Sequence, residues 1–182
     1  MAAAKKKKRF FNIAIPMIRK TTQLQAFEIK DLDNRFIKYD LTRMLKGKST
    51  VMTFRTQVNE DEVLTIPKEL RLLPFYLKRM VRRGTNYVED SFTTPCKNGE
   101  IKIKPFLVTR RKVSRAVRKA LRNKANEELT IWAKENNFEN MFEDVLRNKI
   151  QRELSIKLKK VYPLSLCEIR VLKVEKESED AQ

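Results

Sequence analysis

The sequence predicts an α+β protein in which antiparallel strands precede two C-terminal helices. Apolar and polar residues alternate in short segments up to Thr109, and beyond it the spacing changes to the 3.6-residue period of a helix. A chain of 182 residues with 41% apolar side chains can bury a core of its own. We therefore expect a single domain over residues 10–174, with strands at about 10–109, helices at about 112–162 and a final strand at about 165–174. A basic arm (residues 1–9) and an acidic tail (residues 175–182) are expected to be disordered.

The sequence predicts extended structure in the first third of the chain. The basic arm leads into an apolar segment, Phe10–Pro16, that is expected to be extended and to dock on the domain. Alternation with a period of two is typical of strands with one buried face. It predicts strands at 26–32 and 50–57, with a turn at Asp33-Asn34. Residues 64–73 leave strand and helix undecided, because Pro67 and Pro74 could each begin a helix.

A short helix and a hairpin are expected next. Apolar residues at helical spacing after Pro74, followed by Gly84, predict a helix at about 74–83. The segments 87–94 and 100–108 are predicted to pair as strands, because Asn98-Gly99 between them tolerates the positive φ angles of a tight turn. Pro105 cannot donate to a strand ladder, so its strand should bulge there or lie at an edge.

The C-terminal part contains two predicted helices. The first, near 112–134, has an apolar stripe that includes Val113, Leu121, Leu129 and Trp132. The second begins after Asn136-Asn137 and continues its apolar stripe to Val161, where Pro163 ends it. Alternation resumes at 165–174, which predicts the last strand.

Charge is the most informative property of the chain. It has 41 basic and 23 acidic side chains, a formal net charge of +18 and an isoelectric point near 10.1. Between Ile101 and Asn126 there are ten Lys and Arg and no Asp or Glu. A cationic surface of this kind repels itself unless a polyanion neutralises it, and a phosphate backbone is the partner we infer. The candidate RNA-binding residues are Lys5, Lys6, Lys7, Lys8, Arg9, Lys78, Arg79, Arg82, Arg83, Lys102, Lys104, Arg110, Arg111, Lys112, Arg115, Arg118, Lys119 and Arg122.

Other classes of function find little support in the sequence. The chain has no His and only two widely separated Cys, so we expect no catalytic residues, no metal and no cofactor. We also expect no membrane segment and no signal peptide. Few aromatic residues lie among the cations, which favours structured RNA over a single strand. Three alternatives stay open: a stand-alone RNA chaperone or single-strand RNA binder, a membrane-surface protein, and a metal-dependent nuclease. The nuclease would use the carboxylates Asp31, Asp33, Glu60 and Asp61.

Four stretches in a fixed order resemble a known family. They are RFFNIAIPMI (9–18), the segment 73–83 that ends in Val-Arg-Arg, the segment from Asn98-Gly99 through Thr109-Arg110-Arg111 to Lys119, and KVYPL followed by EIR (160–170). Together they resemble the v-fos transformation effector family of archaeal and eukaryotic small-subunit ribosomal proteins (e-type small-subunit protein one). The chain departs from the family pattern at Phe10, where a tryptophan is usual, and over residues 59–71.

The resemblance implies a β-barrel-like domain with flanking C-terminal helices. It implies a structural, non-catalytic constituent of the small subunit, on the platform beside the mRNA exit region and the 3′ end of the small-subunit RNA. The implied partners are small-subunit rRNA and neighbouring platform proteins, with mRNA as a further candidate and no membrane or small-molecule substrate. The implied location is cytoplasmic, in ribosomes.

Overall fold

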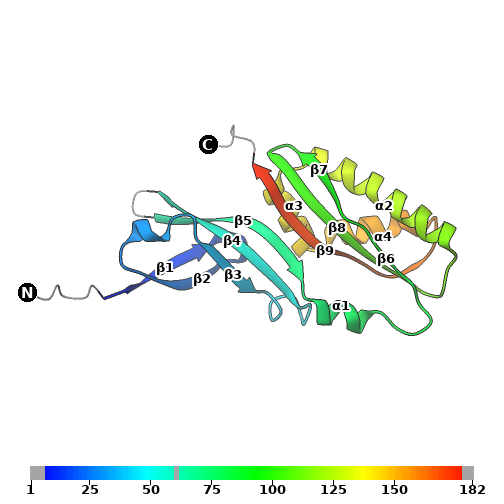
Figure 1. Cartoon of the computed structure of the whole chain (residues 1–182), viewed down its shortest axis with the longest axis horizontal. Coiled ribbons are helices and arrows are strands. Elements are labelled where there is room, and N and C mark those ends of the chain that lie inside the picture. Colours follow the sequence, from blue (N-terminus) through cyan, green and yellow to red (C-terminus); the bar gives the residue numbers. More distant parts are fainter. Residues whose placement is uncertain (1–6, 60–61, 178–182) are drawn as a thin grey trace, which may run out of the picture. The chain divides into compact units, whose positions relative to one another are not determined.

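A computed structural model describes residues 7–59 and 62–177, and in it the chain forms two compact units (Figure 1). The N-terminal unit contains the described residues up to Tyr39 together with Thr53–Lys68. The C-terminal unit contains Asp40–Met52 and the described residues from Glu69 onward. Strands β4 (Thr50–Asn59) and β5 (Glu62–Leu72) contribute residues to both units. The expectation of one domain over residues 10–174 stays a prediction.

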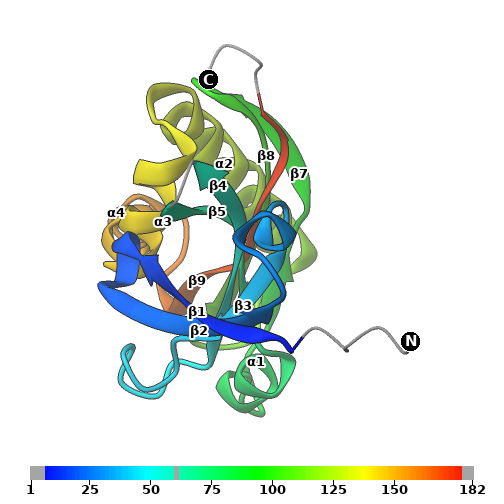
Figure 2. The same ribbon diagram turned by 90° about the vertical axis from the view of Figure 1, so that its left-hand side faces the viewer.

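The N-terminal unit is built on a hairpin of β1 (Arg9–Ile15) and β2 (Lys20–Ala26), which run antiparallel side by side (Figure 2). A 3₁₀ turn over Pro16–Ile18 joins them, and Arg19 closes it in the left-handed region at φ 50°. Strand β3 (Phe36–Asp40) follows. Ile13 is buried in an apolar cluster with Ala26, Leu32 and Ile37.

The predicted strand at 26–32 is wrong. Ala26 ends β2, and Ile29–Leu32 form a 3₁₀ helix instead. Glu28 and Asp31 make a capping box there: the Asp31 carboxylate accepts from the Glu28 backbone N–H at 3.2 Å, and the Glu28 side chain accepts from the Asp31 backbone N–H. Acidic side chains that bond to nearby backbone groups favour a turn over a sheet ladder, which alternation alone does not reveal.

The C-terminal unit is organised around a long antiparallel pair of strands. Strand β8 (Gly99–Thr109) pairs with β9 (Leu164–Glu177) over its whole length, and with β6 (Tyr87–Glu89) and β7 (Phe92–Cys96) on its other side. The seven-stranded sheet has the order β3-β4-β5-β9-β8-β6, with β7 also on β8. Residues 64–73, left undecided above, lie almost entirely in β5, and α1 (Pro74–Met80) follows.

The hairpin and the bulge at Pro105 are confirmed, but the strand predicted at 87–94 is divided into β6 and β7. The two-residue turn Lys97-Asn98 joins β7 to β8, and Gly99, which opens β8, has φ 144°. A Cβ atom at Gly99 would lie 2.1 Å from the backbone oxygen of Lys176, so only glycine lets β9 approach so closely. The β8–β9 register shifts between Lys104 and Pro105, which is the bulge expected at a proline within a strand.

Three helices, not two, complete the unit. Helix α2 (Arg115–Glu135) matches the first prediction, but the second predicted helix is divided into α3 (Phe138–Leu146) and α4 (Lys149–Leu158). The break is at Asn148, which adopts the left-handed conformation at φ 56° and accepts a hydrogen bond from Lys48 Nζ at 2.8 Å. This contact spans 100 residues of chain, so no local pattern could predict it.

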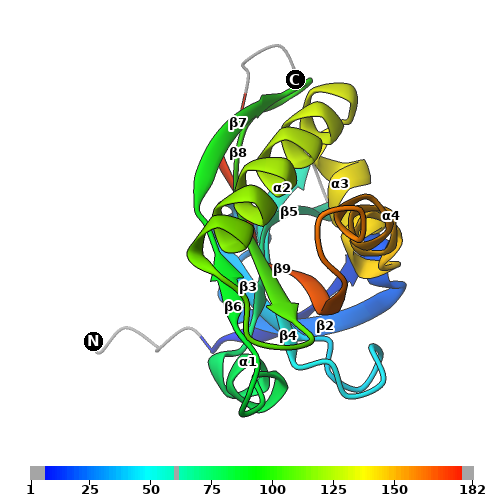
Figure 3. The same ribbon diagram turned by 90° about the vertical axis from the view of Figure 1, so that its right-hand side faces the viewer.

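The helices cover one face of the strands in this unit (Figure 3). Leu121, Ala125 and Leu129 form a buried stripe on α2, which contacts β6, β7 and α4. The α+β class is therefore confirmed. The barrel is not: within residues 7–59 and 62–177 the sheet is an open path from β3 to β6. The final strand is longer than expected, because Glu175–Glu177 of the predicted tail belong to β9, while residues 178–182 lie outside the described part.

Candidate nucleic-acid interface

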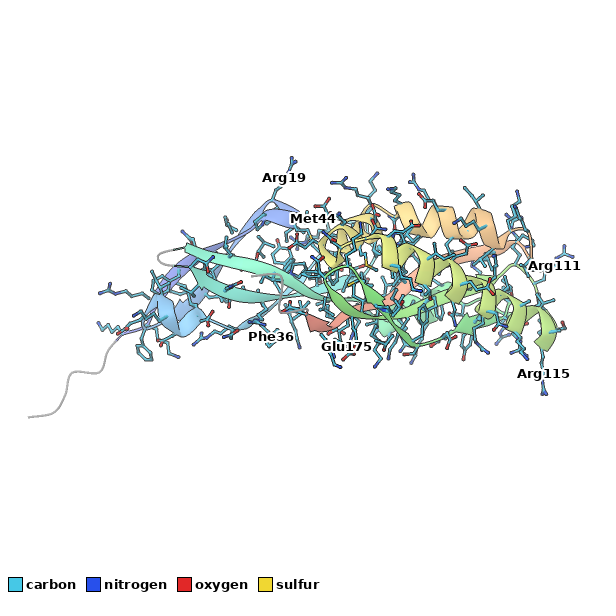
Figure 4. The ribbon with its side chains drawn as sticks, turned by 90° about the horizontal axis from the view of Figure 1, so that it is seen from above. Arg19, Phe36, Met44, Arg111, Arg115 and Glu175 are labelled. Carbon is cyan, nitrogen blue, oxygen red and sulfur yellow. The ribbon has the colours of Figure 1, made fainter. Side chains whose placement is uncertain are left out.

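Six cations gather at one end of the C-terminal unit, and we call this set the cationic end. Two lie in the turn after α1, three in the loop between β8 and α2, and one opens α2. Figure 4 shows Arg111 and Arg115 projecting away from the ribbon. All six side chains are exposed: Arg82, Arg83, Arg110, Arg111, Lys112 and Arg115.

Hydrogen bonds around Asn86 bring these two segments together. The Thr109 backbone N–H donates to the Asn86 carbonyl oxygen at 2.9 Å, and the Asn86 N–H donates to Thr109 Oγ1 at 3.0 Å. The Val113 N–H donates to Asn86 Oδ1 at 2.9 Å, and Thr109 Oγ1 donates to the Arg111 carbonyl oxygen at 2.7 Å. The loop is therefore fastened at both ends to the segment that follows Arg82 and Arg83. The cations are held on an ordered backbone.

The acidic side chains that follow Asn86 in the chain, Glu89 and Asp90, interact with other residues. Glu89 Oε2 accepts from Arg170 Nη1 at 2.7 Å. Asp90 Oδ2 accepts from Asn126 Nδ2 at 2.6 Å and lies 4.0 Å from Arg122 Nε. Among the residues that the structure describes, no acidic group forms an ion pair with any member of the cationic end. Its charge is therefore uncompensated within this part of the chain.

The start of α2 adds further positive potential. Ser114 caps the helix, with its Oγ accepting from the Val117 N–H at 3.3 Å. The first turn of the helix carries no acidic residue, and Arg115 occupies its first position. The amino end of a helix bears a partial positive charge that normally attracts acids and repels cations. A cation there raises the free energy of the unbound protein, and a bound anion relieves the repulsion.

The structure does not bring every predicted site residue into this surface. Arg122 is tied to the turn between β6 and β7, since it also donates from Nε to the Glu89 carbonyl oxygen at 3.3 Å. Arg118 is half-buried, and its Nε is buried with no hydrogen-bond partner. Lys119 is exposed on the adjoining turn of α2. Sequence reasoning missed Asn86 and Thr109, which position the loop, because only the strand pairing reveals their contact.

The two strand lysines lie elsewhere. Lys102 and Lys104 alternate with the buried Ile101 and Ile103, so they point to the other face of β8. Lys102 Nζ is 3.5 Å from Glu175 Oε1 on β9 and is therefore partly neutralised. Lys102 and Lys104 therefore do not belong to the cationic end.

Two smaller groups of predicted cations are also exposed. Lys78 and Arg79 lie on α1, where the Arg79 guanidinium lies 5.8 Å from the centre of the Tyr76 ring. Lys7, Lys8 and Arg9 precede and open β1 in the N-terminal unit, and Lys8 Nζ lies 5.6 Å from the Phe27 ring. Lys5 and Lys6 fall outside the described residues.

The described residues offer little to the other chemistries considered above. They contain no group of three or more metal-binding side chains. Asp33 Oδ1 accepts from the Val58 N–H at 3.2 Å and Asp31 serves the capping box, while Glu60 and Asp61 lie outside the described part. No helix over residues 7–59 and 62–177 is long and apolar enough to cross a membrane. Burial raises the pKa of the Cys167 thiol to about 12, with Glu168 adding to the shift, so this thiol stays protonated.

A basic α+β fold with an ordered, uncompensated cationic end is typical of proteins that associate with nucleic acids. Comparison with known sequences narrows this class. Residues 2–178 match the Ribosomal S3Ae family, and the chain belongs to that family of ribosomal proteins. The resemblance noted in the sequence is thereby confirmed, and with it a structural role in the ribosome.

Archaeal relatives agree with this assignment. A protein named small ribosomal subunit protein eS1 from Saccharolobus islandicus is 26% identical over 183 residues, covering 96% of this chain and 88% of the relative. Its namesake from Methanothermobacter thermautotrophicus is 34% identical over 95 residues, covering 52% of this chain and 49% of the relative. Another from Halorubrum lacusprofundi is 28% identical over 138 residues, covering 75% of this chain and 64% of the relative.

Proposed function

We propose that this protein binds small-subunit rRNA through phosphate contacts made by the cationic end, and so supports translation as a structural constituent of the platform. The observation that carries the proposal is the uncompensated charge of this surface on an ordered backbone. Arginine and lysine that neutralise phosphates release condensed counterions, which gives affinity with little dependence on sequence. The arginines can also bind phosphate oxygens in a bidentate manner.

The shape of the surface favours structured RNA. Apart from Arg115 and its neighbours on α2, the cations lie in two short loops held by Asn86, and no aromatic residue lies within these loops. Single-strand binders combine their cations with stacking rings, whereas double-stranded RNA is recognised through backbone and shape. The family resemblance supports a place near the mRNA exit region, with neighbouring platform proteins as further partners. We propose that the basic arm at Lys5–Arg9 passes between RNA elements.

Incorporation into ribosomal subunits tests this proposal. A tagged chain carrying Arg110→Gln, Arg111→Gln, Lys112→Gln and Arg115→Gln, called the loop variant, would be expressed beside the natural protein. Its occupancy in small subunits separated on a sucrose gradient should fall about tenfold or more, because four phosphate contacts are lost. Natural occupancy of the loop variant would refute the proposed contact surface. A natural chain found mainly free of subunits would instead support a stand-alone RNA chaperone.

A further inference from the structure

A cavity of about 390 Å³ lies beside α1 in the C-terminal unit. Leu77 and Val81 line it from α1 and the residue that follows the helix, while Tyr87 and Phe106 line it from β6 and β8. This volume is within the range of pockets that hold small organic ligands. These four lining residues are apolar or aromatic.

An aromatic pair forms part of the wall. The rings of Tyr87 and Phe106 stack with centroids 5.9 Å apart and planes inclined by 22°. Phe106 is buried at 2% exposure, whereas Tyr87 is 53% exposed, so the tyrosine rests on the core and still presents ring surface outward. A flat aromatic ligand could stack on Tyr87 without any rearrangement of the core.

The lining also includes the ion pair of Glu89 and Arg170. Their side chains are 37% and 38% exposed, so both keep hydrogen-bonding capacity toward the cavity besides the 2.7 Å contact between them. A carboxylate accepts two hydrogen bonds in one plane, and a guanidinium donates in the same manner. Guanine matches this pair, because two adjacent N–H donors on its Watson–Crick edge can bind the carboxylate while its carbonyl oxygen accepts from the arginine.

Four cations lie on α1 or shortly after it, and one of them lines the cavity. Lys78 is part of its lining, and the exposed Arg79, Arg82 and Arg83 follow within five residues. None of the four forms an ion pair with an acidic group within the described ranges. They would attract the phosphates on either side of a bound nucleotide. We infer that this cavity takes an unpaired guanine base displayed by folded RNA. The inference rests on the proposed rRNA binding and adds base recognition to it.

Matched RNA hairpins test the inference. Each would carry the same stem and one unpaired position holding G, A, U, C or an abasic site, with affinity measured by fluorescence anisotropy. The guanine hairpin should bind about tenfold or more tightly than the abasic one, because stacking on an aromatic side chain contributes about 1–3 kcal/mol per base. Tyr87→Leu should abolish this ratio, and Tyr87→Phe should keep it. Glu89→Gln should reduce the preference for guanine over adenine and leave stacking in place.

The abasic hairpin separates this inference from the proposed function. It contacts the protein through its backbone only, so its binding reports on the cationic end and should be unchanged by Tyr87→Leu. An equal affinity of guanine and abasic hairpins in the natural chain would overturn the inference while the proposed function stands. The same holds if Tyr87→Leu, shown by circular dichroism to be folded, keeps the full guanine preference. If the natural chain does not bind the abasic hairpin, the proposed function itself is refuted.

Discussion

The loop variant should change how RNA affinity depends on salt. Its four side chains are exposed and form no ion pair within the described part of the chain, so glutamine removes the charges and disturbs no contact of the fold. Glutamine also keeps most of each aliphatic stem. The change therefore isolates the electrostatic contribution of the loop and the first turn of α2.

The magnitude follows from counterion release. Each phosphate neutralised on a duplex contributes about −0.9 to the slope of log affinity against log salt concentration. If every residue of the cationic end contacts a phosphate, the slope from this surface is about −5, and the loop variant retains about −2. Between about 50 and 200 mM salt, the natural chain should then lose about 10³-fold in affinity and the loop variant only about tenfold.

The assay is fluorescence anisotropy with a labelled fragment of small-subunit rRNA over this salt range. A control variant removes the same charge from four exposed cations that do have acidic partners. It carries glutamine at Arg71, Arg147, Lys149 and Lys176, whose nitrogens lie 2.6, 2.9, 3.7 and 3.7 Å from carboxylate oxygens. For this control variant, the slope of log affinity against log salt concentration should stay within about one of the value for the natural chain, because acidic partners already neutralise these cations.

Two results would refute the reasoning. A slope that changes by less than about one in the loop variant would show that these cations do not contact phosphates. Equal changes in both variants would show that net charge alone governs binding. Stability offers an independent check: at low salt the melting temperature of the loop variant should equal or exceed that of the natural chain, because mutual repulsion is reduced.

Three further predictions concern the folded chain. Lys48→Met should lower the free energy of unfolding by about 3–5 kcal/mol in chemical denaturation, because Glu168, 2.6 Å away and buried, would lose its partner. Gly99→Ala should lower it by more than about 1 kcal/mol, because the added Cβ would collide with the Lys176 backbone oxygen. The Cys167 thiol should react with a thiol reagent at about pH 8 far more slowly than a free thiol, because its pKa is about 12.

Each of these predictions has a control and a contradicting outcome. Adding Glu168→Gln to the lysine variant should recover part of the lost stability, and no recovery would argue against an unpaired charge as the cause. Gly47 also has a positive φ, but an added Cβ there would have no atom within 4 Å. Gly47→Ala should therefore lower the free energy of unfolding by less than Gly99→Ala does. In a Cys96→Ser chain, rapid modification of the native protein would contradict the raised pKa of the Cys167 thiol. Since the raised thiol pKa lies above the ordinary 9.0, stability should also fall as pH rises from about 9 toward 12.

Local patterns in the sequence predicted much of the secondary structure. The strand at 50–57, the Asn98-Gly99 hairpin, the bulge at Pro105 and α2 all depend on residues close together in the chain. One error came from a distant contact and the other from a local capping pattern that alternation concealed. Asn148 divides the last helix with the help of Lys48, and Glu28 with Asp31 turns an alternating segment into a 3₁₀ helix.

The sequence by itself determined the charge, the absence of acids between Ile101 and Asn126, and the family. Only the tertiary structure decided which cations act together. Strand pairing places Asn86 beside Thr109 and so joins two basic loops, while alternation along β8 turns Lys102 and Lys104 to another face. Net charge is a sum over residues and does not depend on how the chain folds. A binding surface is a spatial arrangement, which depends on hydrogen bonds between segments far apart in the chain.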